Sequence, residues 1–392
     1  MKEKQNESFE TSQKDNTVPV RKSTLILLFC LCGVLAAGTG VGIYRSYRSQ
    51  DTYRELDQLA KTVKQNYYTD VDENDVMQGA MKGYVAGLDD PYSQYMTDEE
   101  YSAYQTDEAG QTIGIGVTVQ QNEDGYLQVV SVSDDSPAKD AGIQAADVIL
   151  KVGEDDVAEL GYAGAVAEVR GEAGTTVTLT IQRGDQTKEL EVERRSMDVT
   201  TAQGKMLDGN IGYIRISAFK GNTPEQFQAI FDQLVQDGAK ALVFDLRDDG
   251  GGLVDVTCNI LDELLPEGLI VYTEDKYGNR QEEYSDAEHY FDGKMAVLVN
   301  GNSASASEIF AGAIKDYGVG TLIGTQTFGK GIVQSLFPLS DGSAIEITVS
   351  RYYTPAGNNI HEVGIAPDIV LDKDTESADD NQLQKAIEVL SE

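Results

Sequence analysis

The chain has 392 residues, more than one compact core usually holds, so two or three domains are expected. Its formal net charge of -35 argues against nucleic acid as a partner, because phosphate binding depends on clustered Lys and Arg, and it predicts a solvated acidic exterior. Cys258 is the only cysteine outside the N-terminal apolar run, and it is expected to be a buried small hydrophobe. No Cys/His spacing predicts a metal or cofactor.

The N-terminal part contains an uncharged stretch over residues 25–44 (LILLFCLCGVLAAGTGVGIY), about as long as a helix that crosses a bilayer. Arg21 and Lys22 precede it. We therefore predict an uncleaved anchor over residues 23–44 and a cytoplasmic tail over residues 1–22. The protein is then a single-pass protein of the cell membrane, with the residues after the anchor extracytoplasmic.

A cleaved signal peptide is the competing interpretation of this stretch. Ala36 and Ala37 offer only a poor cleavage site, and the apolar run continues past them. Lipid attachment at Cys30 or Cys32 is disfavoured further, because a bulky residue precedes each cysteine.

Residues 45–110 are predicted to form a helical region. Apolar residues recur at three- and four-residue spacing, first at Leu56, Leu59, Val63 and Tyr67 and again at Val76, Met77, Met81 and Val85. The patch GLDDPYSQY is rich in turn residues, and its Asp90-Pro91 pair should stop a helix. A helical arm that packs on another surface is expected.

Residues 111–195 carry short β runs and two helical segments, which predicts a small, partly open barrel. In the loop Gly114-Ile115-Gly116-Val117, small residues would let backbone N–H groups converge on an anion such as a peptide C-terminal carboxylate. A tight strand entry is the alternative for this loop. The order of elements, with the segments SPA, AGIQAADVILKVG and VRGEAGTTVTLTI, resembles the PDZ domains of bacterial proteases and implies a peptide-binding domain.

Strands alternate with helices over residues 196–375, which predicts an α/β core with a parallel-rich sheet. Alternating apolar residues on both sides of Asp341-Gly342 predict a hairpin. Residues 376–392 are expected to contain a short C-terminal helix, NQLQKAIEVL. In open α/β sheets, functional sites lie where strands end and helices begin.

Two such junctions carry candidate chemistry. In DLRDDGGGL, residues 245–253, the glycines leave backbone N–H groups available to an oxyanion. In VLVNGNSASASEIF, residues 297–310, Ser303, Ser305 and Ser307 alternate with alanines at a helix start. A serine at a helix start is usually a cap, so this run alone does not identify a nucleophile.

The chain offers few groups that could act as the base. A Ser-His-Asp triad is disfavoured, because the only histidines, His289 and His361, lie in loop-like segments. Lys330 stands between two glycines in otherwise apolar surroundings (GTQTFGKGIVQ), where burial would lower its pKa from about 10.4 towards 7, as a base requires. An ordinary surface lysine in a Gly-rich turn is the alternative for Lys330 taken by itself.

The segments NGNSASASEI and TFGKGIVQ together resemble the C-terminal processing peptidases, also called tail-specific proteases, over nearly all of residues 51–392. The resemblance implies an α/β multidomain fold with a PDZ-like β domain and a crotonase-like protease core. It also implies an ATP-independent serine endopeptidase that recognises C-terminal tails of exported or membrane proteins and cleaves through an acyl-enzyme. The nucleophile would be Ser305 and the base Lys330, 25 positions later.

Further site residues follow from the resemblance alone. Gln334 corresponds to a residue that steadies the lysine, and Glu308 to a position linked to the active site in relatives. The oxyanion hole would use backbone N–H groups of Ala306, Gly251 and Gly252.

One position departs from the family pattern. The family usually has asparagine where this chain has Asp249, and a carboxylate near a developing oxyanion is unfavourable. We therefore expect Asp249 to turn away, or the local geometry to differ. In the PDZ-type domain, Ile115 and Gly116 would cradle the substrate carboxylate, and Arg170 matches an arginine thought to communicate peptide occupancy. A salt-bridging helix residue is the alternative for Arg170.

The expected partners are proteins or peptides with accessible C-termini and the membrane, with an adaptor protein as a further candidate. Relatives often assemble through the helical region, which makes residues 45–110 a candidate for homodimer formation. A catalytically silent PDZ-based binding or scaffolding protein is the alternative function. A trypsin-like protease with a PDZ domain is disfavoured, because such proteins place the PDZ domain after the protease and rely on a histidine.

Overall fold

The computed structural model describes residues 54–286, 288 and 290–392. The described residues belong to two compact units, divided between Ala80 and Met81, and each unit is described by itself. The anchor predicted over residues 23–44 lies outside the described residues. Within the described part of the chain, no helix combines the length and the apolar character needed to span a bilayer.

The N-terminal region is largely helical, as the periodicity predicts. Residues 54–66 form a helix, followed by α2 (Glu73–Ala86) and α3 (Asp98–Glu108), which begins with a capping box between Thr97 and Glu100. The Asp90-Pro91 pair does follow the end of a helix. The short strand β1 (Gln94–Met96) was not expected, and it exists because it pairs with a distant strand, β18.

The β domain begins and ends on a two-stranded ladder, in which β2 (Gln111–Gly114) pairs with β9 (Arg195–Asp198). Between them one sheet has the order β3-β4-β5-β7-β8, with β6 paired to β5. Its strands are β3 (Val117–Gln121), β4 (Leu127–Val132), β5 (Val148–Val152), β6 (Asp155–Asp156), β7 (Thr176–Arg183) and β8 (Gln186–Glu193). The two predicted helical segments are α4 (Pro137–Asp140) and α5 (Val157–Val169).

The C-terminal part is built on a sheet of order β10-β11-β12-β15-β16-β19, parallel except for its first pair. The strands are β10 (Ala202–Leu207), β11 (Ile211–Ile216), β12 (Ala241–Asp245), β15 (Lys294–Val299), β16 (Gly320–Gly324) and β19 (Ile369–Val370). The run ALVFD of β12 is buried throughout, which is what a strand covered on both faces requires.

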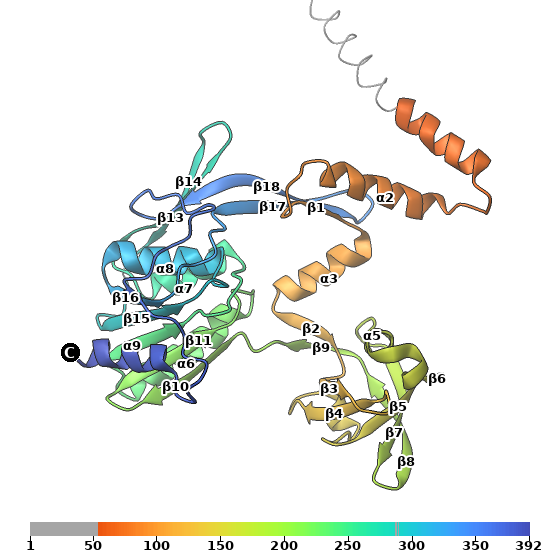
Figure 1. The fold of residues 1–392 in the computed structure, drawn as a ribbon, viewed down its shortest axis with the longest axis horizontal. Coiled ribbons are helices and arrows are strands. Elements are labelled where there is room, and N and C mark those ends of the chain that lie inside the picture. Colours follow the sequence, from red (N-terminus) through yellow and green to blue (C-terminus); the bar gives the residue numbers. More distant parts are fainter. Residues whose placement is uncertain (1–53, 287, 289) are drawn as a thin grey trace, which may run out of the picture. The chain divides into compact units, whose positions relative to one another are not determined.

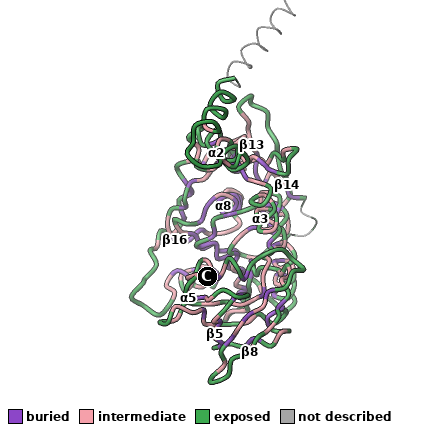
Figure 2. Tube along the Cα trace, turned by 90° about the vertical axis from the view of Figure 1, so that its right-hand side faces the viewer, coloured by how far each residue is buried: buried purple, intermediate pink, exposed green. Residues whose placement is uncertain are grey.

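Helices cover both faces of this sheet (Figure 1). Leu242 and Phe244 pack with α6 (Thr223–Gln236), α7 (Val254–Asp262) and α8 (Ala306–Tyr317), whereas Ala241 and Val243 pack with α9 (Asn381–Ser391). Cys258 is buried in the first of these cores, as predicted. Figure 2 colours the chain by burial and shows α8 largely buried and α2 almost wholly exposed.

A second sheet of order β1-β18-β13-β14, with β17 paired to β18, lies within the same unit. Its longer strands are β13 (Gly268–Asp275), β14 (Arg280–Ser285), β17 (Ile332–Pro338) and β18 (Ala344–Tyr353). The antiparallel pairing of β17 with β18 confirms the predicted hairpin around Asp341-Gly342.

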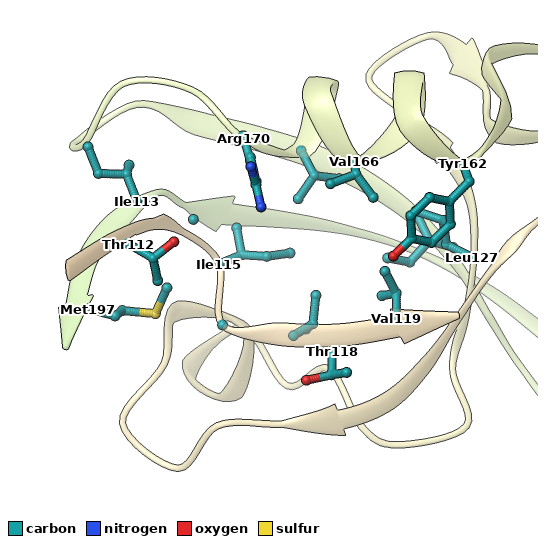
Figure 3. Close-up of a pocket in the computed structure, with 15 residues that line it drawn as sticks. Thr112, Ile113, Ile115, Thr118, Val119, Leu127, Tyr162, Val166, Arg170 and Met197 are labelled. Atoms are coloured by element: carbon teal, nitrogen blue, oxygen red, sulfur yellow. The ribbon is translucent and has the colours of Figure 1, made fainter. Parts of the chain in front are cut away.

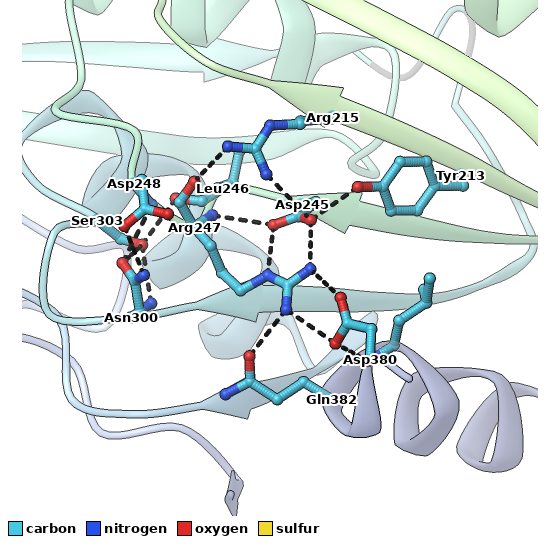
Figure 4. A network of polar contacts seen from close by, with 11 residues as sticks. Tyr213, Arg215, Asp245, Leu246, Arg247, Asp248, Asn300, Ser303, Asp380 and Gln382 are labelled. Atoms are coloured by element: carbon cyan, nitrogen blue, oxygen red, sulfur yellow. Dashed lines mark hydrogen bonds and ion pairs between the residues drawn. The ribbon is translucent and has the colours of Figure 1, made fainter. Parts of the chain in front are cut away.

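A buried polar network fixes the end of β12 (Figure 4). The Arg247 guanidinium donates to both carboxylate oxygens of Asp245, at 2.8 and 2.6 Å, and to Asp380 at 3.0 and 2.7 Å. Asp380 is also the N-cap of α9, accepting the Leu383 N–H at 3.1 Å. Because every charge has a partner, the network holds α9 and the turn after β12 in one arrangement.

Candidate active site

A cavity of about 460 Å³ opens beside the carboxyl ends of β12 and β15, a size that suits side chains of a bound peptide. The segments that follow these strands bring the two predicted junctions together. The sequence-predicted residues that line the cavity are Gly251, Gly252, Ser305, Lys330 and Gln334.

The serines of the SASAS run have different surroundings. Ser303 is buried and donates its hydroxyl to the Leu246 carbonyl at 2.7 Å. Ser307 is also buried and donates to the Asp249 carbonyl at 3.0 Å. Both pin the start of α8 to the turn after β12. Ser305 is the member of the run that lines the cavity.

The backbone of Ser305 has φ 56° and ψ -116°, a strained conformation for a residue other than glycine. Two side chains hold it there. The Tyr352 hydroxyl donates to the Ser305 carbonyl at 2.9 Å, and the Ser305 N–H donates to Glu308 Oε2 at 2.9 Å. Ser305 is thus the N-cap residue of α8, held in a strained backbone conformation, and it lines the cavity.

The glycine turn lies directly against this serine. A Cβ on Gly251 would come within 2.6 Å of the Ala304 carbonyl oxygen and 2.8 Å of the Ala306 nitrogen, and the φ of Gly251 is +100°. Only glycine fits this position. The Gly251 N–H donates to Asp249 Oδ1 at 2.8 Å. Among the described residues, the N–H groups of Gly252 and Ala306 have no hydrogen-bond partner.

The Asp249 side chain is fully buried behind the glycine turn. Within the described part of the chain its Oδ2 has no hydrogen-bond partner. Burial raises the pKa of Asp249 to about 7, against the smaller opposing effects of the Gly251 N–H, Ser307 and Arg215. The carboxyl is therefore largely protonated below neutral pH, which avoids a negative charge behind the turn.

Lys330 lies on the loop before β17 and is half-buried. Burial lowers its pKa below the usual lysine value, and the carboxylates of Glu346, Asp90 and Glu108 oppose this effect. Its Nζ lies 4.6 Å from the centroid of the Tyr92 ring. Among the described residues no hydrogen bond joins Lys330 to Ser305.

The glycines on either side of Lys330 allow the loop to pass close to other backbone. Gly329 has φ +94°, and a Cβ on Gly331 would meet the His361 nitrogen at 2.5 Å. His361 thus packs against the lysine loop, which its sequence context did not indicate. His289 lies outside the described residues.

Glu308 connects the serine with the lysine loop. Its Oε1 accepts from Thr327 Oγ1 at 2.6 Å and the Gly329 N–H at 2.8 Å. Its Oε2 accepts from the Lys330 N–H and the Ser305 N–H, each at 2.9 Å. The side chain is fully buried. Gln334 donates to Thr348 Oγ1 at 2.9 Å and lies in the same cavity as Lys330 without bonding it.

Sequence reasoning missed Tyr92 and Tyr352. Both reach the site through the second sheet, Tyr92 from the turn before β1 and Tyr352 from β18. The alternating pattern of β18 indicates that Tyr352 is buried, but nothing local indicates its contact with Ser305.

A second cavity, of about 310 Å³, lies in the β domain (Figure 3). It is lined by all five predicted peptide-binding residues, Gly114, Ile115, Gly116, Val117 and Arg170. The apolar side chains of Val119, Tyr162 and Val166 form much of its wall.

Arg170 ends α5, and its side chain points towards the Ile115 loop (Figure 3). It makes no ion pair with any acidic side chain of the described residues, which speaks against the alternative of a salt-bridging helix residue. Gly116 has φ +79°, and a Cβ there would lie 2.2 Å from Ser136 Cβ. The groove therefore combines a glycine loop, apolar walls and one unpaired cation.

Three parts of the chain match known families. Residues 210–371 match peptidase family S41, residues 113–193 match the PDZ domain, and residues 43–100 match the N-terminal domain of the activating protease CtpB. The chain is thus a multidomain α/β protein with a PDZ domain and an S41 protease core.

Individual relatives are similar over most of the chain. A probable CtpA-like serine protease of Staphylococcus epidermidis is 36% identical over 81% of this chain, which spans 65% of that relative's length. The carboxy-terminal-processing protease of Bartonella bacilliformis is 35% identical over 88% of this chain and 82% of its own.

Two solved structures have a similar fold. The photosystem II D1 C-terminal processing protease is 29% identical, with a TM-score of 0.50 over 86% of this chain and 90% of its own. A putative S41 protease from Bacteroides fragilis has a TM-score of 0.53 over 85% and 97% of the two chains, at 17% identity. The chain belongs to the carboxy-terminal-processing proteases of peptidase family S41.

Proposed function

We propose that this protein is an ATP-independent serine endopeptidase in which Ser305 is the nucleophile and Lys330 the general base. One observation carries the assignment. Ser303 and Ser307 are buried and bonded to backbone carbonyls, whereas Ser305 lines the same cavity as Lys330, whose pKa is lowered by burial. Membership of the carboxy-terminal-processing proteases supports it.

In the proposed reaction, the neutral amine of Lys330 takes the proton of Ser305 Oγ as the oxygen attacks the scissile carbonyl carbon. The developing oxyanion is bound by the free N–H groups of Gly252 and Ala306, because the Gly251 N–H is already bonded to Asp249. The lysine then passes its proton to the leaving amine, which leaves an ester on Ser305. Water hydrolyses the ester, and Gln334 steadies the ammonium from within the cavity.

The test is hydrolysis of an unfolded protein by Ser305→Ala and Lys330→Ala variants, with labelling of Ser305 by a fluorophosphonate in the presence of a C-terminal peptide. We expect each variant to lose activity. Ser131→Ala and Lys151→Ala, at exposed positions of the β domain, are matched controls that should retain it. Unchanged proteolysis in both active-site variants would exclude this mechanism. If the folded protein is never labelled at Ser305 by the fluorophosphonate, a catalytically silent scaffolding protein is favoured instead.

We propose that substrates are recognised by their C-termini in the PDZ groove. The glycine loop and the unpaired Arg170 suit a terminal carboxylate, and the apolar walls suit the side chains before it. A peptide with a free C-terminus should bind more tightly than the same peptide amidated. Arg170→Gln should reduce this preference, whereas Lys151→Gln should not.

We propose that residues 23–44 anchor the protein and that the catalytic part is extracytoplasmic. The charge-free stretch supports a span, and the basic residues before it support a cytoplasmic tail. Protease added to intact cells should cleave the part after residue 44, and the protein should sediment with membranes. Release of the protein into the medium would instead indicate cleavage of a signal peptide. An adaptor protein would be sought by crosslinking in the same cells.

We further propose that the helical region forms a homodimer contact. Leu59, which follows the apolar periodicity, exposes 59% of its surface, and Tyr68 and Tyr84, which stand next to periodic positions, expose 86% and 83%. Large side chains with apolar surface exposed to this extent can mark a contact with another chain. The full chain in detergent should sediment as a dimer. Leu59→Asp with Tyr84→Asp should make it monomeric, whereas a double change at the exposed Tyr277 and Tyr284 of the β13–β14 hairpin should not.

A further inference from the structure

The turn between α2 and β1 is built rigidly onto the second sheet. Asp90 accepts the Ser93 hydroxyl at 2.6 Å and the Tyr92 N–H at 3.0 Å. Ser93 Oγ in turn accepts the Thr348 N–H of β18 at 3.1 Å, and β1 continues as a partner of that strand. These bonds fix the position of Tyr92, which lies between Asp90 and Ser93.

The ammonium group of Lys330 lies over the Tyr92 ring. The distance of 4.6 Å from Nζ to the ring centroid falls within the range of cation–π attraction. The backbone of Lys330 is held separately, by the bond from its N–H to Glu308. The lysine is thus fixed at both ends, in a position where it is not bonded to Ser305.

Three carboxylates face the same ammonium from different elements: Glu346 from β18, Asp90 from the turn before β1, and Glu108 from α3. Glu346 accepts the Tyr104 hydroxyl at 3.2 Å, and Glu108 pairs with Lys220 at 2.7 Å. Among the described residues no carboxylate lies within ion-pair distance of Lys330. The Tyr92 ring does contact the ammonium directly, and the face of an aromatic ring favours the charged form of a lysine.

We propose that Tyr92 is a positioning residue of the active site, whose ring holds the protonated form of Lys330 and releases it as the neutral amine that accepts the Ser305 proton. The ring quadrupole attracts a cation but not an uncharged amine, so release is coupled to deprotonation. The inference rests on the proposed roles of Ser305 and Lys330.

The ring should raise the pKa of Lys330 and so delay the appearance of the base as pH rises. In the pH profile of kcat/KM, the acid limb reports this deprotonation in the free enzyme. Weakening the ring should move the acid limb to lower pH, by about half a unit to one unit for complete loss of a cation–π contact. A ring that merely shields the lysine from water would have the opposite effect, because water stabilises the ammonium.

The experiment uses the full chain with Tyr92→Phe and then with phenylalanine carrying one, two and three ring fluorines at the same position. Fluorine withdraws charge from the ring face with little change in shape. We expect the Phe variant to keep the acid limb of the wild type, and each fluorine to move it to lower pH. The same series at Tyr277, an exposed hairpin residue, is the control and should not move it.

A second readout does not depend on activity. In a Ser305→Ala background, NMR titration of the labelled Lys330 side chain should give a pKa that falls with each fluorine at position 92. The role of Tyr92 is overturned if the acid limb and the pKa of Lys330 stay constant or rise along the fluorine series. In that case hydrolysis still depends on Lys330, and the dyad stands. Hydrolysis that survives Lys330→Ala contradicts the dyad instead, and the role of Tyr92 falls with it.

Discussion

Glu308 Oε2 accepts the backbone N–H of Lys330 at 2.9 Å, and the same oxygen accepts the N–H of Ser305 at the same distance. One buried carboxylate therefore sets the spacing between the helix start that carries the serine and the loop that carries the lysine. A carboxylate suits this place because all four of its partners are donors.

Replacing Glu308 by Gln should disturb this spacing, because one amide end would place N–H groups against N–H donors. We expect kcat to fall about 10- to 100-fold with little change in KM, since the reacting groups are misplaced. Thermal unfolding should show a loss of about 2 to 3 kcal/mol. Glu282→Gln, on an exposed strand, should change neither quantity. Equal losses in both variants would contradict the role given to Glu308.

Tyr352→Phe tests the strained backbone of Ser305. The change removes the hydroxyl that donates to the Ser305 carbonyl and leaves the ring in place. Because this bond helps to hold a positive φ, we expect kcat to fall about tenfold and stability to fall by about 1 kcal/mol. The neighbour Tyr353, whose ring stacks on Tyr272, provides the control Tyr353→Phe. Wild-type kcat in Tyr352→Phe would show that Ser305 keeps its conformation without the bond.

Much of the fold follows from local sequence. The run ALVFD has no polar face, so it predicts a strand covered on both sides, and the glycines after it predict a turn. The serine run and Lys330 are each ambiguous when read alone, since a cap and a surface lysine explain them equally well. Their pairing came from the resemblance to a family, not from local pattern.

The remaining features depend on contacts between distant segments, which local pattern does not encode. Strand β1 has three residues and exists through its pairing with β18. Tyr92 reaches Lys330 by the same pairing. The Gly251 N–H was expected to face the oxyanion, but it donates to Asp249. The sequence alone does not tell which N–H, that of Gly251 or that of Gly252, is left free for the oxyanion.

Gly116→Ala is expected to disable the PDZ groove. The residue has φ +79°, and the new methyl group would lie 2.2 Å from Ser136 Cβ, so both backbone and packing oppose it. We expect a loss of roughly 2 to 5 kcal/mol and at least about tenfold weaker binding of a C-terminal peptide, measured by calorimetry. Gly184→Ala is a matched control, because Gly184 has φ +58° and a Cβ added there would meet nothing within 4 Å. It should cost about 1 kcal/mol and leave affinity unchanged.

Asp249 should make stability depend on pH. Its pKa is raised from 3.8 to about 7 in the fold, because burial disfavours the ionised form. Well below pH 3.8 the carboxyl is protonated in both the folded and the unfolded chain. As pH rises further, the unfolded chain loses this proton first, so the free energy of unfolding decreases until the folded-state pKa is passed. The total decrease is at most about 4 kcal/mol.

Asp249→Asn removes this proton and should remove the corresponding pH dependence. The amide keeps an oxygen to accept the Gly251 N–H, so the turn is retained, while its second group stays buried without a partner as Oδ2 does now. Denaturant unfolding at pH 5, 7 and 8 should therefore show the variant gaining stability relative to the wild type as pH rises. Asp255→Asn, which removes a carboxylate at an exposed position of α7, is the control measured beside it. A difference between Asp249→Asn and the wild type that is constant from pH 5 to 8 would mean that the Asp249 carboxyl ionises in the fold as readily as in the unfolded chain.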